Sequence, residues 1–157
     1  MAVVELEEFA GALRQYDRLL GLDLGTKTIG IALSDVMRMV ATPVETLAKG
    51  KFSKDVLKIK QLIAKEEVAG IVLGLPREMD GGLGKRAQAT KAFASNLSRE
   101  IDLPILLWDE RLSTVAVERV LIDEADMTRK RRAEVVDRAA AAFILQGVLD
   151  ALGHQYG

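Results

Sequence analysis

The chain has 157 residues, the length of one domain, and its 22 basic and 23 acidic side chains leave a formal net charge of −1. This balance gives the whole molecule no electric field that would gather nucleic acid or an anionic membrane. The absence of cysteine excludes disulfides, iron–sulfur clusters and cysteine nucleophiles, and a single histidine, His154, argues against a histidine-based catalytic triad. Catalysis by this chain must therefore use carboxylates, hydroxyls, Lys, Arg or backbone groups.

The N-terminal segment, residues 1–18, predicts a short amphipathic helix. Its apolar residues recur at roughly helical spacing, at Val4, Leu6, Phe9 and Leu13. The segment lacks the basic start and apolar centre of a signal peptide, and no stretch of the chain approaches the roughly 18 apolar residues of a membrane span. We expect a cytoplasmic protein without membrane contact, in which 1–18 is a helical extension of one domain at 19–157.

The domain predicts strands first and then alternating helices and strands. Three tightly linked strands that should form an antiparallel meander are expected at 19–24, 29–33 and 39–47. Pro43 in the third of these favours an edge or a bulge. The later elements are helices at 53–67, 85–100, 113–123 and 133–152, and strands at 68–75 and 105–108. This order predicts an α/β fold with a mixed five-stranded sheet flanked by helices.

Asp23, inside the first apolar strand, is the first candidate site residue. Ligands of such sheets bind at the carboxyl ends of parallel strands, and a buried carboxylate is costly unless it is paired or binds a metal. The turn that follows holds Gly25, Thr26, Lys27 and Thr28. Lys27 and Thr28 could contact phosphate or could be exposed turn residues, and Asp23 could equally cap nearby amides.

The second candidate is the acid-acid-base sequence Asp109, Glu110, Arg111, directly after the last expected strand. Either acid could bind a hard cation, and Arg111 could hold a phosphate through two hydrogen bonds. The alternative is a surface salt bridge followed by a helix cap at Ser113.

The third candidate is Asp137, which on a helix shares a face with Ala140, Ala141 and Ile144. Alternatively, Asp137 has no functional role and is simply an acid near the start of a helix, where the macrodipole favours negative charge. The joint pattern favours function, because all three acids stand where an apolar or neutral residue is expected. Oxygen ligands of this kind suit Mg²⁺ or Mn²⁺, and two such ions can hydrolyse a phosphodiester.

Two further segments could support such a site. The glycine-rich loop 74–82, which includes Gly74 and Pro76, could approach a phosphate or could be a plain connection. A basic run just before the last expected helix could hold phosphates or could be a solvated turn; it consists of Arg129, Lys130, Arg131 and Arg132. Because only 4% of the residues are aromatic, we expect nucleic acid to be bound through its backbone and shape rather than by base stacking.

Five motifs, in the same order along the chain, resemble those of the YqgF/RuvX family. They are GLDLGTKTIGIALSD at 21–35, ATP at 41–43, VLGLPREMDGG at 72–82, DERLST at 109–114 and VDRAAAAFILQ at 136–146. The resemblance extends from about Leu19 to Asp150. It implies a ribonuclease H-like fold akin to Holliday-junction resolvases. It also implies a bacterial nuclease that matures the 5′ end of the small-subunit ribosomal RNA precursor. The family's three acids fall on Asp23, Glu110 and Asp137, which leaves Asp109 a supporting role.

The sequence therefore predicts an endonuclease that depends on Mg²⁺ or Mn²⁺ and acts on structured RNA, as a monomer or a homodimer. Lys27, Thr28, Arg111 and the basic run would position the RNA. A Holliday-junction resolvase acting on branched DNA as a dimer is the rival within nucleases. An actin-like or sugar-kinase ATPase would share the DLGT phosphate loop but needs two such domains. A non-catalytic factor bound to ribosomal precursor or transcription complexes, which retains the acids, is the alternative outside enzymes.

Overall fold

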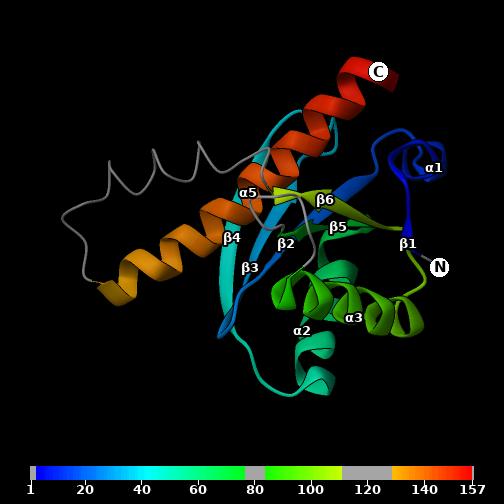
Figure 1. The fold of residues 1–157 in the computed structure, drawn as a ribbon. Helices are drawn as coiled ribbons and strands as arrows, with labels where there is room; N and C mark the ends of the chain where they lie inside the picture. Colours follow the sequence, from blue (N-terminus) through cyan, green and yellow to red (C-terminus); the bar gives the residue numbers. More distant parts are fainter. Residues whose placement is uncertain (1–2, 77–83, 111–128, 157) are drawn as a thin grey trace.

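The computed structural model describes residues 3–76, 84–110 and 129–156, and the side chains within these ranges except at 129–138 and 154–156. At its centre is a mixed sheet of six strands in the order β1-β6-β5-β2-β3-β4 (Figure 1). The strands are β1 (Val3–Val4), β2 (Arg18–Leu24), β3 (Thr28–Ser34), β4 (Ala41–Ala48), β5 (Val68–Leu75) and β6 (Ile105–Asp109).

The strand directions confirm the expected meander followed by parallel additions. Strands β2, β3 and β4 are antiparallel neighbours, whereas β5, β6 and β1 run parallel to β2. The expectation of five strands was wrong by one, because Val3 and Val4 pair with Ile105 and Leu106 along the outer side of β6. A two-residue strand is too short to show the alternation by which strands are recognised in a sequence.

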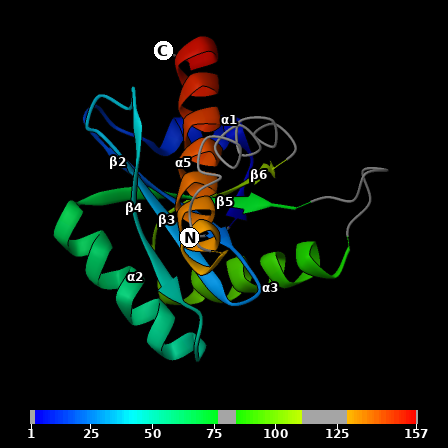
Figure 2. The same ribbon diagram turned by 90° about the vertical axis from the view of Figure 1, so that its left-hand side faces the viewer.

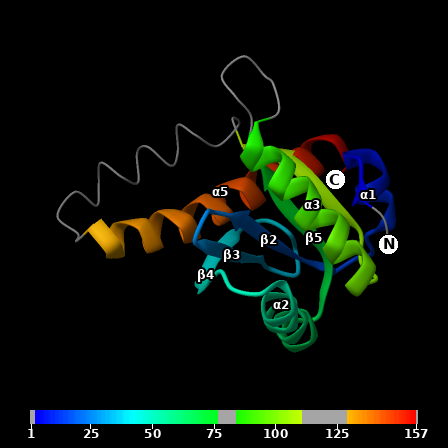
Figure 3. The ribbon, with the colours of Figure 1, turned by 60° about the horizontal axis from the view of Figure 1, so that its bottom comes forward.

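Helices cover both faces of the sheet. They are α1 (Leu6–Ala12), α2 (Phe52–Glu66), α3 (Lys85–Glu100) and α5 (Arg129–Tyr156). Figures 2 and 3 show α2 and α3 on one face and α5 on the other. The basic run was expected to precede the last helix, but the structure places it in the first turn of α5. The helix expected at 113–123 lies outside the described residues.

Each face of the sheet has its own apolar core. Alternate residues of β2 divide between the two, since Leu20 and Leu22 pack with α2 and α3, whereas Leu19 packs with α1 and α5. A strand buried on both faces reads as a continuous apolar run, and β2 does so after its first residue, Arg18, except at Asp23. Within the described ranges, no helix is long and apolar enough to cross a membrane.

Strand β4 forms one outer edge of the sheet and carries a bulge. Ile31 of β3 pairs with Glu45, but the next residue, Ala32, pairs with Pro43, so Val44 is an extra residue in β4. This confirms the expectation that Pro43 marks an edge or a bulge, because proline has no N–H to donate to a ladder.

The turn between β3 and β4 is held by Asp35. Its Oδ1 accepts hydrogen bonds from the backbone N–H groups of Met39 at 2.8 Å and Val40 at 3.0 Å. These bonds, that of Val40 foremost, lower the pKa of the Asp35 carboxyl below its usual range. Because Asp35 follows the end of antiparallel β3, this turn lies at the opposite end of the sheet from Asp23.

Candidate active site

Asp23 lies near the carboxyl end of β2, in the middle of the sheet. Its side chain is only 6% exposed, and its Cα pairs with Gly30 of β3. On the other side of β2, Leu22 pairs with Leu73 of parallel β5. The next residues of the two strands, Asp23 and Gly74, are therefore also neighbours. The structure thus confirms that an acid interrupts the buried run at the strand end where ligands of such sheets bind.

Glu110 follows β6 directly and its side chain lies over Gly74. A Cβ built on Gly74 would come within 3.2 Å of Glu110 Cγ and 3.3 Å of Glu110 Oε1. The Cβ would also come within 2.5 Å of Ile144 Cδ1, so no side chain fits at position 74 without displacing its neighbours. The absence of a side chain at Gly74 therefore makes room for Glu110 to lie over β5, beside the strand that carries Asp23.

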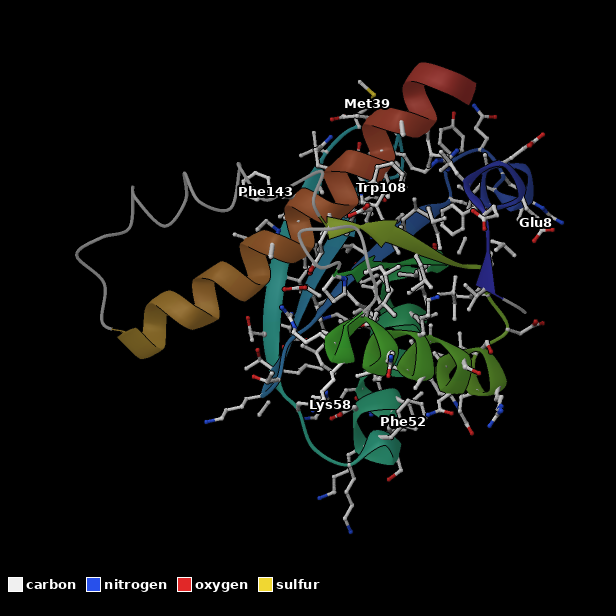
Figure 4. The ribbon with its side chains drawn as sticks, viewed as in Figure 1. Glu8, Met39, Phe52, Lys58, Trp108 and Phe143 are labelled. Atoms are coloured by element: carbon white, nitrogen blue, oxygen red, sulfur yellow. The ribbon has the colours of Figure 1, made fainter. Side chains whose placement is uncertain are left out.

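Both acids are on the face of the sheet that α5 covers. Gly21, two residues before Asp23 and hence on the same face, lies directly under the helix. A Cβ there would be 2.8 Å from Leu145 Cβ and 3.1 Å from the Ala141 carbonyl oxygen. Trp108, which pairs with Gly74, lies beneath the same helix, where its Nε1 would be 3.0 Å from a Cβ on Gly147 (Figure 4).

Helix α5 runs opposite to β2, which directs its earlier turns toward the acids. The backbone N–H of Ala41 donates to Gln146 Oε1 at 2.9 Å, and Ala41 belongs to the end of the sheet where β2 begins. Residues before Ala141 consequently lie toward the carboxyl end of β2. Asp137 is in α5, one helical turn before Ala141. Its side chain lies outside the described residues.

The β2–β3 turn contains four residues expected to support the site. Gly25 donates its N–H to the Thr28 carbonyl oxygen at 2.8 Å, which closes the turn, and Thr26 and Lys27 are exposed. Asp109, the last residue of β6, and Pro76, just after β5, are both half-buried at the same end of the sheet. Arg111 and residues 77–83 of the glycine-rich loop lie outside the described residues, as do the side chains of the basic run.

Two cations that no motif indicated also reach the end of β2. The backbone N–H of Lys49 donates to the Lys27 carbonyl oxygen at 2.9 Å. Nη2 of Arg86, near the start of α3, is 3.4 Å from the Leu24 carbonyl oxygen. Both lie far from Asp23 in the sequence, so only the sheet topology brings them there.

Two carboxylates at one end of the sheet suit a hard divalent cation, which prefers oxygen ligands. Among the side chains that the structure describes, no group of three His, Cys, Asp or Glu residues could hold a metal ion. The buried position of Asp23 and the Glu110 side chain over Gly74 fit metal ligands, and Asp137 is the third candidate acid.

A family model described as "Holliday junction resolvase", RuvX, matches residues 17–151. The chain belongs to the RuvX family. A relative in Rhodospirillum rubrum, named "Putative pre-16S rRNA nuclease", is 60% identical over 99% of this chain and 96% of its own. A relative of the same name in Rhodobacter capsulatus is 56% identical over 95% of this chain and 93% of its own.

Solved resolvase structures share the fold of this RuvX-family chain. RuvC of T. thermophilus in complex with a Holliday junction matches with a TM-score of 0.55 and 11% identity, over 87% of this chain and 96% of its own. The yeast mitochondrial Holliday junction resolvase Ydc2 matches with a TM-score of 0.53 and 14% identity, over 96% of this chain and 86% of its own. These likenesses confirm the ribonuclease H-like fold.

Proposed function

We propose that the chain is a metal-dependent endonuclease that hydrolyses phosphodiester bonds in structured RNA, and that it matures the 5′ end of pre-16S ribosomal RNA in the cytoplasm. The observation that carries the proposal is the placement of Asp23 beside Gly74 and of the Glu110 side chain over Gly74, on the face under α5. The names of the Rhodospirillum rubrum and Rhodobacter capsulatus relatives support the choice of RNA.

In this proposal Asp23, Glu110 and Asp137 hold Mg²⁺ or Mn²⁺. When bound, such an ion makes water a stronger nucleophile and stabilises charge on the leaving oxygen. Asp23 contributes a carboxylate that its buried strand holds in one place. Because Gly74 has no side chain, the Glu110 carboxylate can lie over β5, next to the strand that carries Asp23. Lys27, Thr28, Arg111 and the basic run at 129–132 hold the RNA strand.

The direct test is cleavage by Asp23→Asn, which keeps the shape of the side chain and removes its charge. With structured precursor RNA and Mn²⁺, we expect the cleavage rate to fall by at least about 100-fold, since metal sites lose about 10–100-fold even when only an outer partner is removed. The matched control is Asp35→Asn at the other end of the sheet, which should cleave within twofold of the wild type. Undiminished cutting by Asp23→Asn would refute the proposal.

The role of Asp137 is tested separately by Asp137→Asn. We expect it to lose cleavage as Asp23→Asn does and to weaken Mn²⁺ binding measured by calorimetry, with an unchanged circular dichroism spectrum. If Asp137→Asn cleaves and binds Mn²⁺ like the wild type, the third ligand is another residue. If the wild type binds neither Mg²⁺ nor Mn²⁺, the chain acts as a binding factor rather than a nuclease.

The description of the matching family model favours a second candidate, a resolvase of four-way DNA junctions. Such an enzyme must place two active sites symmetrically, so it should form a homodimer on the junction. The same Mn²⁺ assay with a four-way junction, combined with light scattering, separates the two candidates. A monomer that cuts RNA and leaves the junction intact favours rRNA maturation.

A further inference from the structure

We propose that a basic surface next to Asp23, on the side of helices α2 and α3, binds the phosphate backbone of the RNA beside the bond that is cut. This surface, the lysine rim, consists of Lys49, Lys51, Lys54, Lys85 and Arg86. The inference rests on the proposed function, because it concerns how the same site holds its substrate. It adds an electrostatic surface distinct from the basic run at the start of α5.

Three chain segments meet at the rim, and each is tied to the end of β2. The loop after β4 is joined to the β2–β3 turn by the hydrogen bond from Lys49 N–H to the Lys27 carbonyl oxygen, and Lys49 Nζ is 3.5 Å from the Gly25 carbonyl oxygen. The start of α3 is joined to β2 by the bond from Arg86 to Leu24. Lys49 and Arg86 are therefore held at the end of the strand that carries Asp23.

The start of α2 is fixed in the same place by a buried acid. Asp55 is 3% exposed, and its Oδ1 and Oδ2 lie 3.3 and 3.2 Å from the Gly50 backbone nitrogen, which donates to them. Phe52 packs edge-to-face on Phe93 of α3, with ring centroids 5.5 Å apart. These contacts join the loop that carries Lys49 and Lys51 to both helices, so the rim is a built surface rather than a set of independent side chains.

The charged side chains of these segments are almost all basic. Residues 24–31, 46–54 and 84–91 contain no Asp or Glu, although the chain as a whole has 23 acids and a net charge of −1. All five rim side chains, and that of Lys27, are exposed. The ion pairs Arg18–Glu66 and Lys60–Glu100, at 2.9 and 3.3 Å, are made elsewhere and use none of the rim's cations. Asp55, the next acid in sequence, is turned inward to Gly50.

A basic surface of this kind fits a polyanion whose charges repeat along a line. Each phosphate that a Lys or Arg neutralises releases counterions, so binding becomes weaker as salt rises. The rim lies beside the turn that follows Asp23, to which Lys49 is hydrogen-bonded, and extends over the first turns of α2 and α3. The acids lie on the face under α5 and the rim on the face of α2 and α3. An RNA strand that is cut at the acids would therefore place its neighbouring phosphates on the rim by passing around the end of β2.

The test measures binding apart from cleavage. Every variant carries Asp23→Asn, and fluorescence anisotropy with a labelled structured RNA gives the Kd at several KCl concentrations without divalent metal. The rim variant is Lys49→Gln with Lys51→Gln. The matched control is Lys58→Gln with Lys65→Gln, two exposed lysines further along α2 (Lys58 in Figure 4).

We expect the rim variant to bind RNA about tenfold more weakly at 0.1 M salt, with a plot of log Kd against log salt less steep by about 1.4–1.8, and the control to stay within twofold. If the two double variants weaken binding equally, or if the rim variant binds like the parent, the proposal that the lysine rim binds RNA is refuted. Neither outcome depends on cleavage. If Asp23→Asn cuts RNA at the wild-type rate, the proposed function fails while the binding result stands.

Discussion

Replacement of Gly21 by alanine tests how closely α5 approaches the strand that carries Asp23. The new Cβ would lie 2.8 Å from Leu145 Cβ and 3.1 Å from the Ala141 carbonyl oxygen. Neither atom is the end of a flexible side chain, so rotation of a side chain cannot relieve the overlap. Ordinary carbon contacts are about 3.5–4.0 Å, so the helix must move away from the sheet by about 0.7 Å or more.

Two effects determine the change in stability. Overpacking of this kind lowers the free energy of unfolding by about 1–3 kcal/mol. Alanine also restricts the unfolded chain more than glycine does, which raises the free energy of unfolding by about 0.4–1 kcal/mol. We therefore expect Gly21→Ala to lower the free energy of unfolding by about 1–2 kcal/mol, a fall in Tm of about 2–8 °C for a domain of this size. Since the shift also moves the helix that carries Asp137, cleavage should fall about 10–100-fold.

The matched control is Gly153→Ala, near the end of the same helix. A Cβ there has nothing within 4 Å, so the substitution should stabilise the protein by about 0.5–1 kcal/mol through helix propensity. Thermal and urea unfolding followed by circular dichroism measure both variants, and the cleavage assay is run well below either Tm. If Gly21→Ala is as stable as the wild type and cuts at the same rate, the close approach of α5 to β2 is refuted.

Two further predictions concern residues outside the set of three candidate site acids. The free energy of unfolding of Asp35→Asn should differ from that of the wild type by a constant amount above about pH 5. Because the folded pKa of Asp35 is lowered below its ordinary 3.8, its contribution is present above that value and is lost as the pH falls through the folded pKa. Urea titrations at several pH values check this, and a difference that persists unchanged at pH 2 contradicts it. Gly147→Ala should shift the emission of Trp108, the single tryptophan, because the new Cβ would lie 3.0 Å from its Nε1. An unchanged spectrum would place the indole away from α5.

Strand periodicity predicts Asp23 and the pair Asp109 and Glu110 at one end of the sheet, and the resemblance to the YqgF/RuvX family selects Glu110 from that pair. Asp23 interrupts an apolar run and Glu110 follows one, and the carboxyl ends of parallel strands meet at one end of a sheet. In the structure Asp23 is beside Gly74 on the neighbouring strand, and the side chain of Glu110 lies over Gly74. The contribution of Asp137 stays a prediction, since the structure establishes its place in α5 and does not describe its side chain.

Other features had no local signal. The pairing of Val3 and Val4 with β6 involves too few residues to show a period. The start of α5 at Arg129 was missed because cations are disfavoured at the positive end of the helix macrodipole, so a basic run does not indicate a helix start. Lys49 and Arg86 meet the end of β2 only through long-range packing, which no single segment encodes.

The two edges of the sheet also determine how copies of this protein can associate. An exposed edge strand is a template on which a second chain can add its own strand and begin to aggregate. On one edge of this sheet, Pro43 lacks the N–H that such a strand needs, and the bulge at Val44 puts the ladder out of register. On the other edge, the N-terminal residues Val3 and Val4 occupy part of the outer side of β6, and they offer only two residues for further pairing. Within the described residues, both features disfavour the addition of a strand from another copy, and a truncation that removes β1 should increase aggregation.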